Sequence, residues 1–308
     1  MSSRLLALPF LAAPFITAPA FAETTTELDT LVVTATRLDE LLSLPANITV
    51  ITADDIKNSP SRTLPELLAQ EVGVNTTSFF SQGSRATVGL RGFGETAGQN
   101  TLILLDGRRL NDIDLSEVNF SAIPFENIER IEIVRGSGGV LYGEGATGGT
   151  INIITKDPRD SETYATLSVT GGSFDHREAN ALMSYSDENF GITANIHTID
   201  SDGYRDNNDF EQQNGQIDLR IPAFNGEVYM KLGAYRQELG LPGSRDVGSE
   251  LDSDRKGTST PNDWADEDTE FVTLGYSADI NERDSFVIDS GYRHKQQHSQ
   301  FDYGSGFG

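Results

Sequence analysis

Glycine and strand-forming residues are concentrated together in the stretch Ile123–Lys156, and this combination limits the folds open to the chain. An apolar, β-branched run at residues 128–134 is followed by Arg135-Gly136, by six more glycines and by a second such run, Thr150–Thr155. Glycine tolerates the close approach of another backbone because it has no Cβ atom. The stretch therefore predicts two strands whose connecting backbone is enclosed by other parts of the protein.

Three of these glycines, Gly143, Gly145 and Gly148, match the G-x-G-x-x-G spacing of dinucleotide-binding proteins. That motif needs the glycines to open a helix, whose N-terminus then holds the pyrophosphate. Here they lead directly into the strand-like sequence TINIIT. The spacing therefore does not predict a nucleotide site.

The N-terminus has the pattern of a secretory signal peptide, residues 1–22. Arg4 supplies the positive charge, Leu5–Thr17 the apolar segment, and Ala20-Phe21-Ala22 a cleavage site after Ala22. A membrane-anchoring helix is the weaker interpretation, because the apolar run is short and Pro9 and Pro14 interrupt it. The protein is therefore predicted to be exported.

The composition excludes several further classes of protein. The chain has no cysteine, which excludes a disulfide framework and a thiolate metal site. A formal charge of −24 argues against nucleic acid as a partner, since nucleic-acid binding needs a basic surface. After the signal peptide no apolar run reaches the roughly 18 residues of a membrane-spanning helix. These facts fit two classes of protein. One is an exported β-barrel with a water-filled interior, and the other is a soluble, acidic secreted protein.

Residues 23–40 follow the cleavage site, and the segment up to Glu27 is polar and is predicted to be disordered. A short β-branched run comes next, made of Asp29, Thr30, Leu31, Val32, Val33, Thr34 and Ala35. This run is either the first strand of a domain or a free strand on a flexible leader. A free strand can add to a partner's exposed sheet edge through main-chain hydrogen bonds.

Residues 41–157 predict one mixed α/β domain. A strand is expected at Ile48–Ile51, and Thr52 is placed to cap a short helix that begins at Ala53. The sequence Thr63-Leu64-Pro65-Glu66 has the pattern of a capping box at the start of the helix LPELLAQE. The segments ATVGLRGFG and TLILLDGRRLND read as strands, and the second turns at Asp106-Gly107 as tight hairpins do.

The order of these motifs resembles the plug domain of TonB-dependent outer-membrane transporters. The shared order is LPELL, LRGFG, LILLDGRRL, IERIEIVRG, LYG and GGTINIIT, which covers most of residues 64–155. The resemblance implies a mixed α/β plug domain inside an antiparallel transmembrane β-barrel, which has about 22 strands in the family. It also implies that residues 29–35 are the TonB box, by which TonB and its energising complex in the inner membrane pull on the plug.

The resemblance also suggests roles for single residues. Arg91 and Arg135 resemble two arginines that hold the plug in the barrel by forming ion pairs with carboxylates of the barrel wall. Those carboxylates would lie beyond residue 308. The loops at residues 79–85, 94–100 and 111–119 resemble the plug tips that help to form the substrate pocket. The predicted ligand-binding residues in these loops are Gln82, Arg85, Gln99 and Asp112, although each could be an ordinary solvated loop residue.

From Glu162 onward apolar and polar residues alternate in segments of about ten, the pattern of an outer-membrane barrel. Short connections at residues 187–189, 222–226 and 281–284 alternate with longer ones at 200–210 and 237–268, as periplasmic turns alternate with extracellular loops. Residues 158–308 are therefore predicted to form roughly seven strands, too few to close the barrel. The chain is expected to be the N-terminal portion of a transporter. A soluble β-sandwich, which can also alternate, stays an alternative.

Metal and cofactor signals are weak. The segment 246–268 holds many carboxylates but lacks the spacing of a dedicated calcium loop, so solvation is the favoured interpretation. His294 and His298 would lie about 13 Å apart along a strand, too far to share one ion. Trp264 could be an interfacial anchor or could stack on a ligand. No metal site and no cofactor are predicted.

These observations together predict TonB-dependent import of a scarce nutrient across the outer membrane of a Gram-negative bacterium. A ferric siderophore is the first candidate cargo, and cobalamin, haem or another organic nutrient are alternatives. The expected partners are TonB, the cargo and outer-membrane lipid. No nucleophile is paired with a base, so an enzyme is not expected. A secreted β-rich adhesin or carbohydrate-binding module is the alternative from a different class.

Overall fold

The computed structural model describes residues 47–77, 85–112, 117–120, 123–136, 145–245, 254–281 and 284–302. The chain divides into two compact units, Met1–Val32 and Val33–Gly308, and all described residues belong to the second. The predicted signal peptide, the TonB-box run and Gln82 therefore lie outside the described residues.

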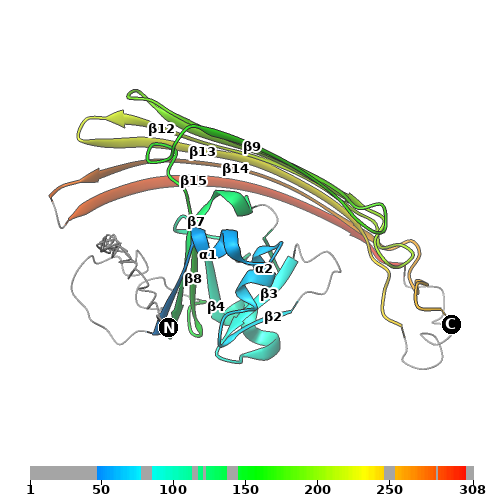
Figure 1. Ribbon diagram of the computed structural model, residues 1–308. Helices are drawn as coiled ribbons and strands as arrows, with labels where there is room; N and C mark the ends of the chain where they lie inside the picture. Colours follow the sequence, from blue (N-terminus) through cyan, green and yellow to red (C-terminus); the bar gives the residue numbers. More distant parts are fainter. Residues whose placement is uncertain are drawn as a thin grey trace, which may run out of the picture. The chain divides into compact units, whose positions relative to one another are not determined.

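Residues 47–157, which we call the plug domain, contain short helices and two small sheets (Figure 1). The main sheet has the strand order β1-β7-β8-β4-β5, in which the β4–β8 pair is parallel and the other pairs are antiparallel. The second sheet has the order β2-β3-β6. The elements are β1 (Asn47–Thr52), α1 (Ala53–Asn58), α2 (Leu64–Leu68), β2 (Val74–Thr77), β3 (Arg85–Leu90), η1 (Gly94–Thr96), α3 (Ala97–Asn100), β4 (Thr101–Leu105), β5 (Arg108–Arg109), β6 (Val118–Asn119), η2 (Phe125–Asn127), β7 (Ile128–Arg135) and β8 (Gly149–Thr155).

Local sequence signals determine where several of these elements begin. Thr52 caps α1 and forms a capping box, in which the Asp55 carboxylate accepts from the Thr52 backbone N–H at 2.9 Å. Thr63 caps α2, and its hydroxyl accepts from the Glu66 N–H at 3.4 Å. Asp106 and Gly107 both have positive φ and join β4 to β5, as a tight hairpin turn requires. The two N-caps and the predicted hairpin are confirmed. The capping box predicted at Thr63 does not form, because the Glu66 carboxylate accepts from the Arg62 N–H, and α2 ends at Leu68 instead of continuing through LPELLAQE.

The plug domain has an apolar core between its sheets and helices. β7 and β8 contribute Ile131, Ile133, Ile151 and Ile153, each with no exposed surface, and residues from α1, α2 and β3 pack in the same cluster. Burying one such side chain stabilises the fold by about 1.5–3 kcal/mol. The backbone is close-packed as well. A Cβ atom at Gly149, where φ is +149°, would overlap the Val134 carbonyl oxygen and lie 2.6 Å from Leu90 Cδ1.

Residues 164–300 form a seven-stranded antiparallel sheet, which we call the wall sheet, with its strands in sequence order (Figure 1). Consecutive strands pair over nearly their whole length. The strands are β9 (Tyr164–Gly171), β10 (Arg177–Ser186), β11 (Gly191–Ser201), β12 (Phe210–Ala223), β13 (Gly226–Gly240), β14 (Trp264–Asp279) and β15 (Ser285–Gln300).

The predicted loop at residues 237–268 is too long, because β13 continues to Gly240 and β14 begins at Trp264. Several of the added residues are polar on both faces, such as the facing pairs Gln237–Glu267 and Glu238–Asp266. They therefore lack the apolar–polar alternation by which strands are recognised. Cross-strand hydrogen bonding, which the sequence pattern does not report, extends the strands here.

The two faces of the wall sheet differ sharply. Its buried side chains are polar, namely Asn180, Ser184, Thr193, Asn195, Ser201, Gln212, Asn214, Gln237 and Glu267, together with a few larger apolar or aromatic ones. Apolar side chains on the opposite face are exposed, for example Leu167 at 75% and Ile196 at 68%. Among the described residues, no helix combines the length and the apolar character needed to cross a membrane.

Candidate functional site at the plug–sheet interface

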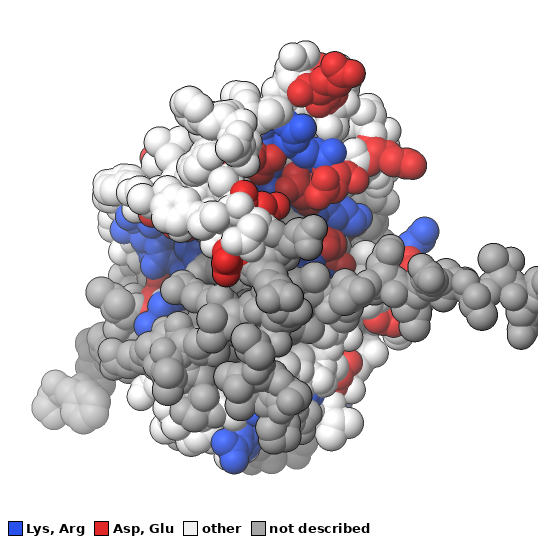
Figure 2. Space-filling view, turned by 90° about the vertical axis from the view of Figure 1, so that its left-hand side faces the viewer, with Lys and Arg blue, Asp and Glu red and all other residues white. Residues whose placement is uncertain are grey.

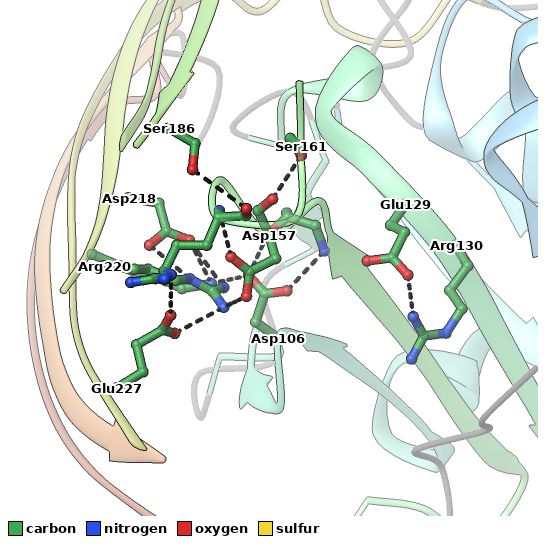
Figure 3. A network of polar contacts seen from close by, with 12 residues as sticks. Asp106, Glu129, Arg130, Asp157, Ser161, Ser186, Asp218, Arg220 and Glu227 are labelled. Atoms are coloured by element: carbon green, nitrogen blue, oxygen red, sulfur yellow. Dashed lines mark hydrogen bonds and ion pairs between the residues drawn. The ribbon is translucent and has the colours of Figure 1, made fainter. Parts of the chain in front are cut away.

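Charged side chains connect the plug domain to the buried face of the wall sheet. They form three groups of contacts, which we call the first, second and third levels. At the first level, Arg220 on β12 lies between the carboxylates of Asp157, Asp218 and Glu227 (Figure 3). Asp157 belongs to the plug domain, and the other two carboxylates belong to the wall sheet. Burial raises the pKa of Asp157 and outweighs the opposing effect of the Arg220 guanidinium. Arg159 adds a further contact to Glu227 at 3.6 Å.

The second level joins the β4–β5 hairpin to β13. Lys231 Nζ lies 2.6 Å from the Asp106 carboxylate and 3.2 Å from Asp218. Asp106 also accepts from the N–H and the hydroxyl of Thr155, at 2.8 and 2.9 Å. Burial alone would raise the pKa of Asp106, but the Lys231 ammonium and these hydrogen bonds outweigh burial and hold that pKa below its ordinary value. Next to this contact, the Arg108 guanidinium lies 4.5 Å from the centre of the Phe271 ring.

The third level is a continuous series of opposite charges. Arg85 pairs with Glu267, Glu267 lies 3.3 Å from Lys295, Lys295 lies 2.7 Å from Asp112, and Asp112 also pairs with Arg293. Arg85 Nε donates in addition to Gln237 Oε1 at 2.8 Å. Burial would raise the pKa of Asp112, but Lys295 and Arg293 together lower it.

The arrangement suits attachment of one domain to another. Lys, Arg, Asp and Glu side chains are interspersed rather than separated into patches of one sign on the face in Figure 2. Removing one partner of a buried ion pair typically costs about 3–5 kcal/mol, because the other charge stays buried and uncompensated. Among the residues that the structure describes, no group of three or more His, Cys, Asp or Glu could hold a metal ion.

The structure separates the predicted ligand-binding residues. Arg85, at the start of β3, and Asp112, after β5, meet the same series of charges on the wall sheet. Gln99 lies at the exposed surface of α3. Gln82 lies outside the described residues. A ligand-binding role for these four residues stays a prediction.

The predicted locking arginines lie at the ends of β3 and β7. Arg91 is exposed and follows β3 with a positive φ of 63°. Arg135 donates to the Val72 carbonyl oxygen at 3.1 Å and to the Thr49 hydroxyl at 2.6 Å, both within the plug domain. Their pairing with wall carboxylates beyond residue 308 also stays a prediction.

Sequence reasoning missed the first two levels of contact. The sequence predicts Asp106 only as a turn residue and gives Asp157 no role. Their partners Arg220 and Lys231 each stand between two apolar residues of an alternating strand. A charged residue in such a position is the signal that the sequence offers.

Comparisons with known proteins agree with this architecture. A model of the family described as "TonB-dependent Receptor Plug Domain" matches residues 40–150. The chain is 32% identical over 231 residues to the vitamin B12 transporter BtuB of Vibrio cholerae, covering 69% of this chain and 37% of that protein. It is 34% identical over 201 residues to a ferric enterobactin receptor of Pseudomonas aeruginosa, covering 58% of this chain and 26% of that protein.

Solved structures show the same fold. The ferric citrate transporter FecA in its unliganded form superimposes with a TM-score of 0.68 at 20% identity, over 83% of this chain and 41% of FecA. The ferric yersiniabactin uptake receptor FyuA of Yersinia pestis gives a TM-score of 0.66 at 20% identity, over 84% of this chain and 42% of FyuA.

A plug domain attached to an antiparallel wall sheet defines the N-terminal architecture of an outer-membrane receptor. The chain belongs to the TonB-dependent receptor family, and it spans about 37% of the length of the first curated relatives that it matches. Membership of this non-enzymatic family places the protein in the outer membrane of a Gram-negative bacterium. Cleavage of a signal peptide after Ala22 stays a prediction.

Proposed function

We propose that the protein imports a scarce nutrient across the outer membrane by TonB-dependent transport. The observation that carries this proposal is the plug domain, whose family model covers residues 40–150 and whose charged groups are bonded to the wall sheet at three levels. In this function the plug domain blocks the path of the nutrient beside the wall sheet. It must therefore move when energy is supplied.

TonB is the proposed partner, and residues 29–35 are the proposed point of attachment. A strand of that kind can pair with the sheet edge of TonB by main-chain hydrogen bonds. The next described element is β1, which among the described strands lies at the edge of the main plug sheet and pairs with β7. A pull on the leader would therefore reach β1 before the rest of the plug domain.

A ferric siderophore is the proposed cargo. Ferric chelates are commonly anionic, and the third level of contacts combines three cationic side chains with two carboxylates in a chain whose formal charge is −24. The cationic residues are Arg85, Arg293 and Lys295, and the acidic ones are Asp112 and Glu267. This local positive excess, together with the ferric enterobactin receptors among the relatives, supports an anionic cargo.

Cobalamin is the second candidate. The relatives of this chain include vitamin B12 transporters of Vibrio species. Titrating the full-length receptor with an anionic ferric siderophore and with cobalamin separates the two candidates. Tight binding of cobalamin with no binding of any ferric chelate would replace the siderophore proposal and leave TonB dependence unaffected.

Deletion of Asp29–Ala35 in the full-length receptor tests the transport mechanism. We expect uptake of the radiolabelled cargo to be abolished while binding at the cell surface is unchanged, because the deletion removes only the attachment to TonB. Deletion of Thr24–Glu27, from the polar start of the same leader, is the matched control and should leave uptake intact. Uptake that survives loss of Asp29–Ala35 would overturn the mechanism.

A further inference from the structure

The chain passes from the plug domain to the wall sheet through residues 156–163, which we call the linker. β8 ends at Thr155 and β9 begins at Tyr164. With 8 residues β9 is the shortest strand of the wall sheet, and among the described strands it pairs with β10 alone. Tension along the chain that leaves the plug domain therefore arrives first at this short strand, unless the linker is held elsewhere.

The linker is held by strands other than β9. The Asp157 carboxylate pairs with Arg220 on β12, and Figure 3 shows the two side chains directed toward each other. Arg159 Nε lies 3.6 Å from the Glu227 carboxylate on β13. The Arg159 carbonyl oxygen also accepts from the hydroxyl of Ser186, the last residue of β10, at 3.3 Å. Asp157 and Arg159 therefore connect the linker to β10, β12 and β13.

The linker also lies directly on the first residue of β11, Gly191. A Cβ atom at Gly191 would lie 2.7 Å from Arg159 Cγ and 3.0 Å from the carbonyl carbon of the buried Pro158. The linker is folded into a turn at this point, because the Asp157 carbonyl oxygen accepts from the Ser161 hydroxyl at 2.6 Å and the Asp157 carboxylate accepts from the Arg159 N–H at 2.8 Å. The linker is therefore fixed by packing as well as by charge.

We propose that these contacts form a mechanical stop, which keeps a force on the plug domain from reaching β9. The stop, which we call the linker clamp, consists of Asp157, Arg159, Ser186, Arg220 and Glu227. Its ion pairs are partly buried, so water and salt weaken them less than they weaken exposed pairs. Residues 162 and 163, which follow the clamp, are exposed and carry no tension while the clamp holds.

The inference rests on the proposed pull of TonB on the leader. It holds whether the plug domain moves as one body or element by element, because both movements put tension on the linker. By holding the linker on three longer strands, the clamp lets the plug domain move while the wall sheet keeps its first strand in place.

Pulling on single full-length receptors in a membrane tests the clamp without TonB. The chain has no cysteine, so Thr25→Cys supplies one attachment point in the leader. A receptor with the intact clamp should give a force peak when the stretched chain reaches Asp157, about 45 nm from the attachment point. When Asp157→Asn and Arg159→Gln are added, this peak should be lost, and the next resistance should begin at Tyr164, about 2.5 nm further along the chain.

A matched control changes two exposed residues of the same linker, Asp160→Asn and Glu162→Gln. This control should keep the force peak at Asp157. If the clamp variant fails to fold, as judged by its migration in gels before and after heating, Gly191→Ala takes its place. The added Cβ atom presses on Arg159 without removing a charge, and the peak at Asp157 should again be lost.

Cells that take up the cargo test the clamp under its working load. During uptake the clamp variant should lose folded receptor, measured in unheated gels, and deletion of Asp29–Ala35 from the same variant should prevent this loss. An equal loss with and without the deletion would overturn the proposal, because Asp157 and Arg159 would then stabilise only the receptor at rest. A force peak that persists at Asp157 in the clamp variant would also overturn it. If uptake does not depend on residues 29–35, the proposed function fails, whereas the pulling measurement still decides whether the clamp exists.

Discussion

The plug domain and the wall sheet bury opposite kinds of side chain. In the plug domain the fully buried residues are mostly leucine and isoleucine, such as Leu68 and Ile131. In the wall sheet they include Gln212 and Gln237, whereas apolar residues such as Ile288 are 58% exposed. The plug domain is built like a small water-soluble protein, and the wall sheet is built for lipid on one face and for polar contact on the other.

This difference explains why charge rather than apolar packing joins the two regions. The wall sheet offers the plug domain a polar face, and the plug domain keeps most of its apolar residues for its own core. Ion pairs and hydrogen bonds are the contacts available to such a pair of surfaces. An interface of this kind can be separated without exposing an apolar core to water, which suits the proposed movement of the plug domain.

The largest expected effect concerns glycine in the plug domain. Gly149→Ala should lower the free energy of unfolding of the plug domain by about 4–5 kcal/mol, because overpacking and a left-handed φ add their costs. Hydrogen exchange of β7 and β8 in the full-length receptor measures this loss. Gly291→Ala on β15 is the control, since its Cβ atom would come no closer than 3.5 Å to any neighbour. Equal effects of the two changes would contradict the difference between the regions.

Removing an apolar side chain should give the next largest effect. Ile131→Ala leaves a cavity in the plug core and should cost about 3–4 kcal/mol. Ile288→Ala changes an exposed position of the wall sheet and should cost less than about 0.5 kcal/mol. Thermal unfolding in the same detergent compares the two variants. A large loss at Ile288 would show that the outward face packs against protein instead of lipid.

Much of this fold follows from local signals in the sequence. The Thr52 and Thr63 caps and the Asp106-Gly107 turn act within a few residues, so they are readable without the structure. The strand order of the main plug sheet cannot be predicted from such local signals. β1 pairs with β7, and the parallel pair joins β4 to β8, so distant segments decide the topology.

The third prediction concerns the charged series at the third level. Glu267→Gln should destabilise the attachment of the plug domain by about 3 kcal/mol, because Arg85 and Lys295 lose a shared partner in a largely buried site. Hydrogen exchange of β3 reports the loss. Asp175→Asn, which removes the exposed partner of Arg177, should cost less than about 0.5 kcal/mol.

A double-mutant cycle sharpens this test. If Arg85 and Glu267 act through their ion pair, the combined change Arg85→Met and Glu267→Gln should cost clearly less than the two single changes added together. Additive costs would mean that each side chain acts through other neighbours, such as Gln237 or Lys295.

The candidate site was only partly readable from the sequence. The sequence predicts Arg85 and Asp112 because they belong to segments that resemble the plug tips. Their connection through Glu267 and Lys295 depends on how β14 and β15 pair. The contact of Asp106 with Lys231 joins residues 125 positions apart. A single sequence gives the type and the spacing of such residues but not which charges meet.

The smallest expected effect is a pH dependence at the second level. The pKa of Asp106 is held below its ordinary value in the folded protein, so Asp106 contributes stability at pH values above about 4, where the unfolded carboxyl is charged. This contribution is lost as the pH falls through the lowered pKa of the folded state. Asp106→Asn should therefore cost about 1–2 kcal/mol at pH 7, because Lys231 loses a partner whose carboxylate is one-fifth exposed.

The difference between the unchanged receptor and Asp106→Asn should shrink as the pH falls below about 4, because the Asp106 carboxyl is protonated first in the unfolded chain and then, through its lowered pKa, in the folded protein. Calorimetric unfolding from pH 3 to pH 7 measures it, with Asp54→Asn at an exposed position of α1 as the control. A difference that stays constant over this range would mean that the Asp106 hydrogen bonds to Thr155, and not its charge beside Lys231, hold the β4–β5 hairpin in place. The wall sheet would then be a passive surface at this level, while at the third level its charges would still bind the plug domain directly.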